Sequence, residues 1–410
     1  MNKPWVTFLL LAAGAAPVAL VAAWAFVRNP AERVPAIDEI CALARAGEFD
    51  RAQSSLELHL LADPRGAQGH LLMAQFALDR PDPQPAMALH HLRAVRPENP
   101  EKAALVQFCM GKAHYQSSRY DLAERCWTEA LRLNPTVPEA GWALLDLYEL
   151  EGRMEDTHLL GLHLHEVEPD PRDKVRLLIT LARLDIDKSA PSSQVNIFEP
   201  MVKHVPGDLH LSVALGSALI HDSRSEKGLT HLRDAVKTHS NSPEAWDALL
   251  TGLDDAGRPE ELLQEFARLP SLMASAPRFA RHLGQVEQVK HRWDAAVDAY
   301  KRALVYQPFN SVILYRLSRV LRLAGESAEV DRVNERLALY QTAFKQLRPV
   351  IDEALAFKTL GIEAHTDLYL RLADLREQMG RSDEARAWHR LVLKDFPDNK
   401  VSLAAIERLK

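Results

Sequence analysis

The sequence predicts an all-α solenoid built from stacked helix pairs, preceded by one membrane-spanning helix. Two observations support this prediction: small, aromatic and proline residues recur at fixed offsets, and an uncharged apolar run lies near the start. The chain has 410 residues, of which 47% are hydrophobic, so it can form a large core. A solenoid reaches such a length by adding repeats, and it need not split into separate domains.

The first element is a predicted transmembrane helix over residues 5–27, which follows a short tail over residues 1–4. Residues 5–27 carry no charge, and at about 1.5 Å per residue a helix of this length spans a bilayer core. Trp5 and Trp24 lie near its ends, where aromatic rings favour the membrane interface. We therefore expect a single-pass membrane protein.

A cleaved signal peptide is the alternative, with residues 23–25 (Ala-Trp-Ala) as a small-x-small cleavage site. The apolar run exceeds the roughly 7–15 residues of a signal-peptide core, and this favours a retained anchor. The flanking positive charges, Lys3 on one side and Arg28 and Arg33 on the other, are nearly balanced. We expect the repeat domain on the extracytoplasmic side, either anchored or exported after cleavage.

After a polar hinge over residues 28–32, the chain forms helix pairs, and the clearest pair covers residues 104–137. Small residues let two antiparallel helices cross closely, and a large residue fills the space beside the crossing. Proline lacks an N–H group and ends the second helix. In this unit the residues in these roles are Gly111, Ala123, Ala130, Trp127 and Pro135.

The spacing within residues 104–137 resembles the tetratricopeptide repeat (TPR), a helix–turn–helix unit of about 34 residues. The same offsets recur from residue 277, and more sparsely from residues 33, 138 and 366. From residue 277 they fall on Gly284, Ala296, Tyr300, Ala303 and Pro308. The resemblance implies a right-handed TPR superhelical solenoid of about ten repeats, whose first helices line a concave groove.

We expect the TPR solenoid over residues 33–343, an inserted helix and loop over 344–365, and a C-terminal repeat with a capping helix over 366–410. The fifth repeat, 172–206, is irregular because residues 188–194 lengthen its turn. Several inter-helix turns carry a glycine that permits positive φ. These glycines are Gly47, Gly152, Gly257, Gly325 and Gly380. An acid three residues after the turn position favours the positive end of the second helix. These acids are Asp50, Asp121, Glu155, Glu260, Asp294 and Asp383.

The family commonly exposes four positions of each first helix inside the groove, and these positions give the candidate protein-binding residues. In the fourth repeat (138–171) they are Glu139, Trp142, Asp146 and Glu149. In the seventh repeat (243–271) they are Glu244, Asp247, Thr251 and Asp254. In the eighth and ninth repeats (277–310 and 311–343) they are Arg281, Gln285, Gln288, Tyr315, Arg319 and Arg322.

This arrangement predicts a groove with an acidic middle and a basic later part. Segregated charge on a concave wall orients a ligand. Our hypothesis is that the acids attract a basic or mixed-charge segment, while Arg319 and Arg322 orient its acidic end. An ordinary solvated helix face is the alternative.

The sequence offers little for catalysis or metal binding. His163 and His165 point about 200° apart on a helix, and we interpret them, together with His158, as solvated side chains. There is no G-x-S-x-G elbow, no phosphate-binding glycine loop and no H-E-x-x-H motif. The three cysteines, Cys41, Cys109 and Cys126, match neither a disulfide framework nor a zinc motif. We therefore expect no enzyme activity, no metal and no cofactor.

The formal net charge of −6 argues against a nucleic-acid groove, so the expected partners are proteins or extended peptides, with no small-molecule substrate. We predict a membrane-anchored, non-catalytic TPR scaffold that helps to assemble an envelope complex. The main alternative is an accessory or regulatory subunit of an envelope-modifying enzyme, whose activity resides in the partner. A hydrolase with an unrecognised site is a further alternative.

Overall fold

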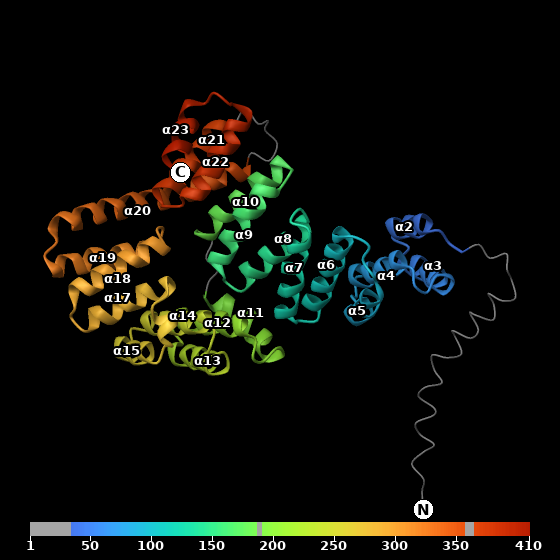
Figure 1. Ribbon diagram of the computed structural model, residues 1–410, viewed down its shortest axis with the longest axis horizontal. Coiled ribbons are helices and arrows are strands. Elements are labelled where there is room, and N and C mark those ends of the chain that lie inside the picture. Colours follow the sequence, from blue (N-terminus) through green and yellow to red (C-terminus); the bar gives the residue numbers. More distant parts are fainter. Residues whose placement is uncertain (1–33, 187–190, 357–364) are drawn as a thin grey trace, which may run out of the picture. The chain divides into compact units, whose positions relative to one another are not determined.

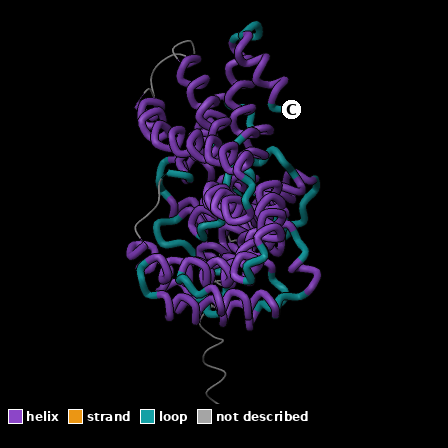
Figure 2. Tube along the Cα trace, turned by 90° about the vertical axis from the view of Figure 1, so that its left-hand side faces the viewer, coloured by secondary structure: helices purple, strands orange, loops and turns teal. Residues whose placement is uncertain are grey.

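A computed structural model describes residues 34–186, 191–356 and 365–410 of the chain. Figure 2 shows helices joined by loops, and no strand occurs in these three ranges. The expected transmembrane helix over 5–27 and the hinge over 28–32 lie outside the described residues. Within the described ranges, no helix combines the length and the apolar character needed to cross a bilayer. The chain divides into two compact units, Met1–Ala140 and Gly141–Lys410.

Unit 1 is a stack of antiparallel helix pairs. Its helices are α2 (Ile37–Arg45), α3 (Phe49–Ala62), α4 (Ala67–Asp79), α5 (Pro85–Ala94), α6 (Pro100–Gln116) and α7 (Tyr120–Leu133). The α6–α7 pair is the repeat over 104–137, and its crossing lies where the sequence predicts it. A Cβ atom on Gly111 would lie 2.4 Å from the Trp127 ring, so only glycine fits at this point.

Most of the described turns inside helix pairs have a left-handed residue. The five glycines named above all have positive φ, which confirms the prediction. Ser118, Ser223 and His291 occupy the same repeat position and also have positive φ, at 56°, 62° and 57°. A left-handed residue other than glycine costs roughly 1–2 kcal/mol, so the turn geometry is imposed by the packed helix pair and not by the turn residue alone.

The predicted acids begin the second helices as expected. Each lies in the first turn of its helix, where the helix dipole favours a negative charge. Asp50, Asp121, Glu155, Glu260, Asp294 and Asp383 begin α3, α7, α9, α15, α18 and α22 in this way.

Unit 2 is also built from helix pairs, and α8 (Pro138–Leu150) begins just before the unit boundary. The next helices are α9 (Met154–Val167), α10 (Pro171–Leu184), α11 (Pro191–His204), α12 (Leu209–His221), α13 (Ser225–Thr238), α14 (Pro243–Asp255) and α15 (Pro259–Ala267). They are followed by α16 (Ser271–Ala274), the 3₁₀ helix η1 (Pro277–Phe279), α17 (Ala280–Val289), α18 (Trp293–Tyr306), α19 (Ser311–Ala324) and α20 (Ser327–Ala356). The last three are α21 (Thr366–Gln378), α22 (Ser382–Asp395) and α23 (Lys400–Arg408).

Residues 172–206, which the sequence pairs as one repeat, separate into two stacks. Helix α10 packs against α9, α20 and α22, whereas α11 packs against α12. Leu178 and Leu181 of α10 share one buried cluster with Leu372 of α21 and Trp388 of α22. In Figure 1, α21 and α22 (red) lie beside α9 and α10 (green). The C-terminal repeat therefore covers the side of α10 on which the next repeat along the chain was expected.

The expected boundary between residues 343 and 344 falls inside α20. This helix runs without interruption from Ser327 to Ala356, so residues 344–356 continue the second helix of the ninth repeat. Residues 357–364, the rest of the expected insertion, lie outside the described residues. Ala343, Leu347 and Val350 of α20 are buried against α10 and α21, which explains why the helix extends past its own repeat.

We predict that Gly111→Leu destabilises unit 1 by roughly 1–3 kcal/mol, because the added side chain overlaps the buried Trp127 ring. Urea denaturation followed by circular dichroism measures the change. Thr128→Leu is the matched control, since Thr128 is exposed on α7. Equal denaturation curves for Gly111→Leu and wild type would contradict the helix crossing described here.

Candidate protein-binding surface

Acidic residues of α14 pair with arginines of the following repeat. Glu244 contacts Arg278 Nη1 at 2.8 Å, and Asp247 Oδ1 contacts Arg281 Nη2 at 3.0 Å. Arg281 also donates to the Thr251 hydroxyl at 2.6 Å. The acidic middle of the groove that the sequence predicts is therefore neutralised from within the protein at these positions.

A third ion pair shows that this surface is concave. Asp254 of α14 accepts from Arg316 of α19 at 2.6 and 2.7 Å, although α17 lies between these helices in the chain. First helices two repeats apart can touch only where the surface curves toward them. We call the exposed side of α14, α17 and α19 the first-helix surface.

Asp247 has a buried histidine as a second partner beside Arg281. Its Oδ1 atom also lies 2.7 Å from His282 Nε2, and His282 is 1% exposed. Burial alone would raise the pKa of the Asp247 carboxyl, but Arg281 and His282 outweigh burial and hold this pKa below its usual range. Burial lowers the pKa of His282, against the opposing effect of Asp247. Asp247 is therefore a fixed anion whose charge is already used inside the protein.

One side of α19 remains open to a partner. Val312 and Tyr315 are 57% and 58% exposed, and Leu323 is 51% exposed. Arg319 and Arg322 are exposed as well, and Arg322 donates to the Ser318 hydroxyl at 3.1 Å. Neither arginine has a carboxylate partner in residues 34–186, 191–356 and 365–410. At about 100° per residue, these five side chains cover an arc of about 100° on the helix, and we call them the α19 strip.

The candidate residues of the fourth repeat lie elsewhere in the chain. Trp142 of α8 lies under the Arg176 guanidinium of α10, which is 4.4 Å from its ring centre. Burial raises the pKa of Asp146, and Arg176 opposes this shift. Burial also raises the pKa of Glu149, and the neighbouring Asp146 adds to it. Glu139 is exposed and belongs to unit 1.

Sequence reasoning missed the arginines that neutralise the acids. Glu244 with Arg278 and Asp247 with Arg281 are each separated by 34 residues, one repeat length. Residues at the same position of successive repeats lie side by side, so opposite charges at this spacing indicate an internal ion pair. Applied to the sequence, this signal identifies both pairs. Arg316 escapes it, because its partner Asp254 is 62 residues away.

A second cluster of charged groups joins distant parts of unit 2. Arg376 of α21 is completely buried and contacts Asp185 and Glu384, each at 2.7 Å. Glu384 also lies 3.2 Å from His158 Nε2, and Arg381 donates to Asp185 at 3.0 Å. We call these five residues the buried ion cluster. Every member has a partner of suitable charge or hydrogen-bonding capacity, so we interpret the cluster as structural.

Two histidines on α9 differ from the sequence interpretation. His158 and His165 are each 5% exposed, so the prediction that they are solvated is wrong. The reason is the C-terminal repeat, which packs on α9 and which the sequence places far away. Burial lowers the pKa of His165 to about 4, so this histidine is neutral at pH 7.

Cys109 is a buried thiol, and burial raises its pKa to about 12.

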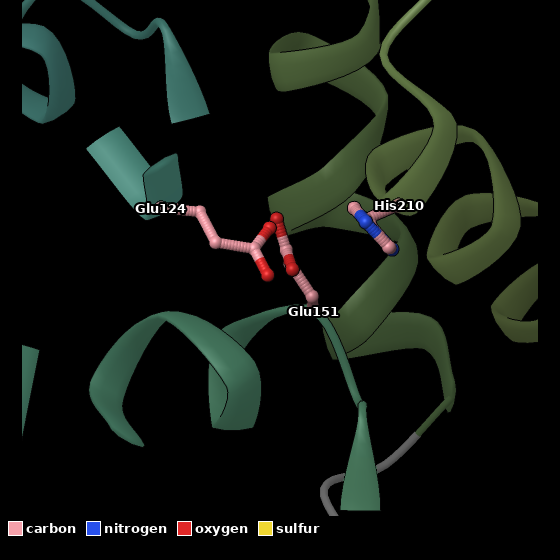
Figure 3. Close-up of side chains that lie close together, drawn as sticks. All are labelled: Glu124, Glu151 and His210. Atoms are coloured by element: carbon pink, nitrogen blue, oxygen red, sulfur yellow. The ribbon is translucent and has the colours of Figure 1, made fainter. Parts of the chain in front are cut away.

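Glu151 and His210 of unit 2 also lie close together. Their possible metal-ligating atoms are within 4.8 Å of one another, and Figure 3 shows the two side chains near each other. Glu124, also drawn in Figure 3, belongs to α7 of unit 1. Arg153 Nη1 lies 3.1 Å from Glu151, so this carboxylate already has a cationic partner. Two ligands from one unit fall short of the three or four protein ligands of a zinc site.

The fold and the surface together define an all-helical, TPR-like solenoid. Folds of this class are typically non-catalytic scaffolds for protein interaction. Residues 104–137 match the family model described as tetratricopeptide repeat. No curated protein matches the sequence.

Several solved structures resemble the chain at low sequence identity. The P58(IPK) TPR domain is 14% identical, with a TM-score of 0.30, and the match covers 84% of this chain and 97% of that one. A tetratricopeptide repeat protein from Parabacteroides merdae is 9% identical, with a TM-score of 0.31 and coverages of 75% and 99%. PilW, described as a type IV pilus biogenesis factor, is 13% identical, with a TM-score of 0.30 and coverages of 53% and 98%.

We predict that Arg376→Met destabilises unit 2 by about 3–5 kcal/mol, because it leaves two carboxylates buried without their main partner. The double variant Arg376→Met with Glu384→Gln should lose less than the sum of the single variants. Thermal denaturation of the three variants measures this coupling. Strict additivity would contradict a direct interaction.

The stability of wild type and of Glu384→Gln should also depend differently on pH. Although burial opposes ionisation of Glu384, Arg376 and His158 hold its folded-state pKa below the unfolded value of about 4.3. The ionised carboxylate therefore stabilises the fold at neutral pH, and this contribution is lost as the pH falls below about 4. Wild type should lose stability more steeply than Glu384→Gln in this range.

Proposed function

We propose that this chain is a non-catalytic, membrane-anchored scaffold that binds proteins or extended peptides on its first-helix surface and helps to assemble an envelope complex. The α19 strip is the observation that carries the proposal. It combines an exposed tyrosine, two arginines and two aliphatic side chains on one concave wall. Tyrosine and arginine are the residues most often responsible for binding energy at protein interfaces.

The charges of the first-helix surface indicate which part of a partner binds there. Glu244, Asp247 and Asp254 are paired internally, so they offer little net attraction to a basic segment. Arg319 and Arg322 lack carboxylate partners in the described parts of the chain and therefore attract an acidic part of the ligand. Single exposed ion pairs contribute only about 0–1 kcal/mol, so these charges act mainly on the association rate.

Membrane attachment is the second part of the proposal. It rests on the uncharged run over residues 5–27 and on the tryptophans near both ends of that run. A tether at the amino terminus leaves the helical repeats outside the bilayer. A scaffold held in this way restricts its partners to the vicinity of one membrane, which raises their effective concentration.

To test the binding surface, we would purify the full chain from solubilised membranes and identify stoichiometric partners. We expect Tyr315→Ala and Arg319→Glu to reduce partner recovery by about tenfold, because both remove contacts at the centre of the α19 strip. Arg332→Glu is the matched control, since Arg332 is an exposed arginine on α20 that also lacks a carboxylate partner in the described ranges. Equal recovery with all three variants would refute the proposed surface.

To test the anchor, membranes are extracted with alkaline carbonate and the amino terminus of the mature protein is sequenced. A retained anchor keeps the protein in the pellet, with residues 5–27 still present. A soluble form that begins near Phe26 would instead establish cleavage and remove the membrane part of the proposal.

A further inference from the structure

The seventh repeat has an incomplete second helix. Helix α15 contains 9 residues, whereas α13 and α18 each contain 14, so α15 is 5 residues shorter. A linker that includes α16 and η1 replaces the missing turns before α17 begins. Because a short irregular linker covers less surface than a helix, the neighbouring helix ends are left partly uncovered.

A pocket of about 370 Å³ lies at this point. Its walls are the linker, the first turn of α17 and the last turns of α18. Among the lining residues are Ala276, Pro277, Ala280, Arg302, Val305 and Tyr306. The volume lies in the range of cavities that hold small ligands or single bulky side chains.

The elements that form this pocket carry unusually exposed apolar side chains. Leu272 of α16 and Val305 of α18 are each 85% exposed, the highest values among large apolar side chains in the described residues. Val305 also lines the pocket. A single exposed leucine or valine needs no explanation, but both of these side chains belong to the elements that form the same pocket. We call the pocket and these two residues the α16–α18 pocket.

The same pocket carries one cation without a carboxylate partner. Neighbouring cations are paired: Lys301 contacts Glu329 at 2.8 Å, and Arg278 contacts Glu244 at 2.8 Å. Arg302 is exposed, and no carboxylate in residues 34–186, 191–356 and 365–410 lies within ion-pair distance of it. The α16–α18 pocket therefore presents an apolar cavity with a guanidinium group in its wall.

We propose that the α16–α18 pocket binds a short segment of a partner protein in which a bulky apolar side chain is adjacent to an acidic residue. The apolar side chain fills the cavity and covers Leu272 and Val305, and the carboxylate pairs with Arg302. Arginine is suited to this role, because its planar guanidinium binds a carboxylate in a bidentate manner. This site is distinct from the first-helix surface and extends the scaffold to a second ligand.

A second copy of this chain fits the pocket less well. A symmetric dimer at this point pairs the same patch from both copies, so it brings the two Arg302 side chains toward each other. Like charges across an interface are unfavourable, and neither pocket supplies an acid. The charge of the site thus favours a different, acidic partner.

The test measures binding of fluorescein-labelled ten-residue peptides to the full chain in detergent by fluorescence anisotropy. One array combines Glu or Asp with Leu or Phe in varied order, a second replaces the acids by Gln or Asn, and a third replaces them by Lys. We expect binding from the acidic array. Val305→Glu should weaken it at least tenfold, because the variant places a charge in the cavity. Arg302→Glu should weaken it about tenfold and favour the Lys array.

The control variant Arg332→Glu makes the same charge change as Arg302→Glu at an exposed arginine outside both proposed surfaces. It should leave acidic-peptide binding unchanged, and since Val305 is exposed, Val305→Glu should keep the wild-type melting temperature. The proposal is overturned if no acidic peptide binds, if the Gln and Asn peptides bind equally well, or if Val305→Glu has no effect. A dimer in light scattering that Val305→Glu dissociates would assign the pocket to a second copy and overturn it as well.

Discussion

The completely buried side chain of Arg376 imposes the strictest constraint on unit 2. A buried guanidinium is tolerated only with anions beside it. Asp185, directly after α10, and Glu384 of α22 supply them. These partners lie about half of the chain apart in sequence, so satisfying one charge fixes the C-terminal repeat on α9 and α10. Arg381 strengthens the join, because its guanidinium lies 3.5 Å from the ring centre of Phe309 in the turn between α18 and α19. The two ends of the segment from α9 to α22, which includes the first-helix surface, are thereby held together.

The local design of the fold could be predicted from the sequence, whereas its closure could not. Gly111 against Trp127 and the left-handed glycine turns follow from side-chain size and φ within one repeat. The packing of α10 against α20 and α22 depends on residues far apart in sequence, and nothing in a 34-residue pattern signals it. The burial of His158 and His165 was missed for the same reason. Solenoid periodicity predicts contacts between neighbouring repeats only, so any contact that breaks the order of repeats escapes it.

For the candidate surface, too, the sequence predicts which residues lie together but not which of them form ion pairs. The sequence predicted which side chains share one side of the first helices, and Asp247 and Arg281 indeed lie together on that surface. It did not predict that these charges neutralise each other, because each ion pair joins two neighbouring repeats and the family positions describe a single repeat. Once the internal pairs are removed, the charges left over are those of Arg319 and Arg322, and it is these remaining charges that a partner encounters. To predict which partner a repeat protein attracts, the relevant charge is therefore the one that remains after residues of neighbouring repeats have formed ion pairs.

The two proposed sites rest on one buried cluster. Ala280, Val297 and Tyr300 of α17 and α18 pack with Leu317 and Val320 of α19 in this cluster, from which the α19 strip and Val305 project. A well-packed cluster transmits little movement when an exposed side chain is replaced. Substitutions at Tyr315 and Val305 should consequently act additively on binding, as expected for independent ligands. If instead occupancy of one site changes affinity at the other, the coupling must come from a shift between two arrangements of the helices. The contact of α9 and α10 with the C-terminal repeat is where we expect such a shift, because the fold departs most from simple stacking there.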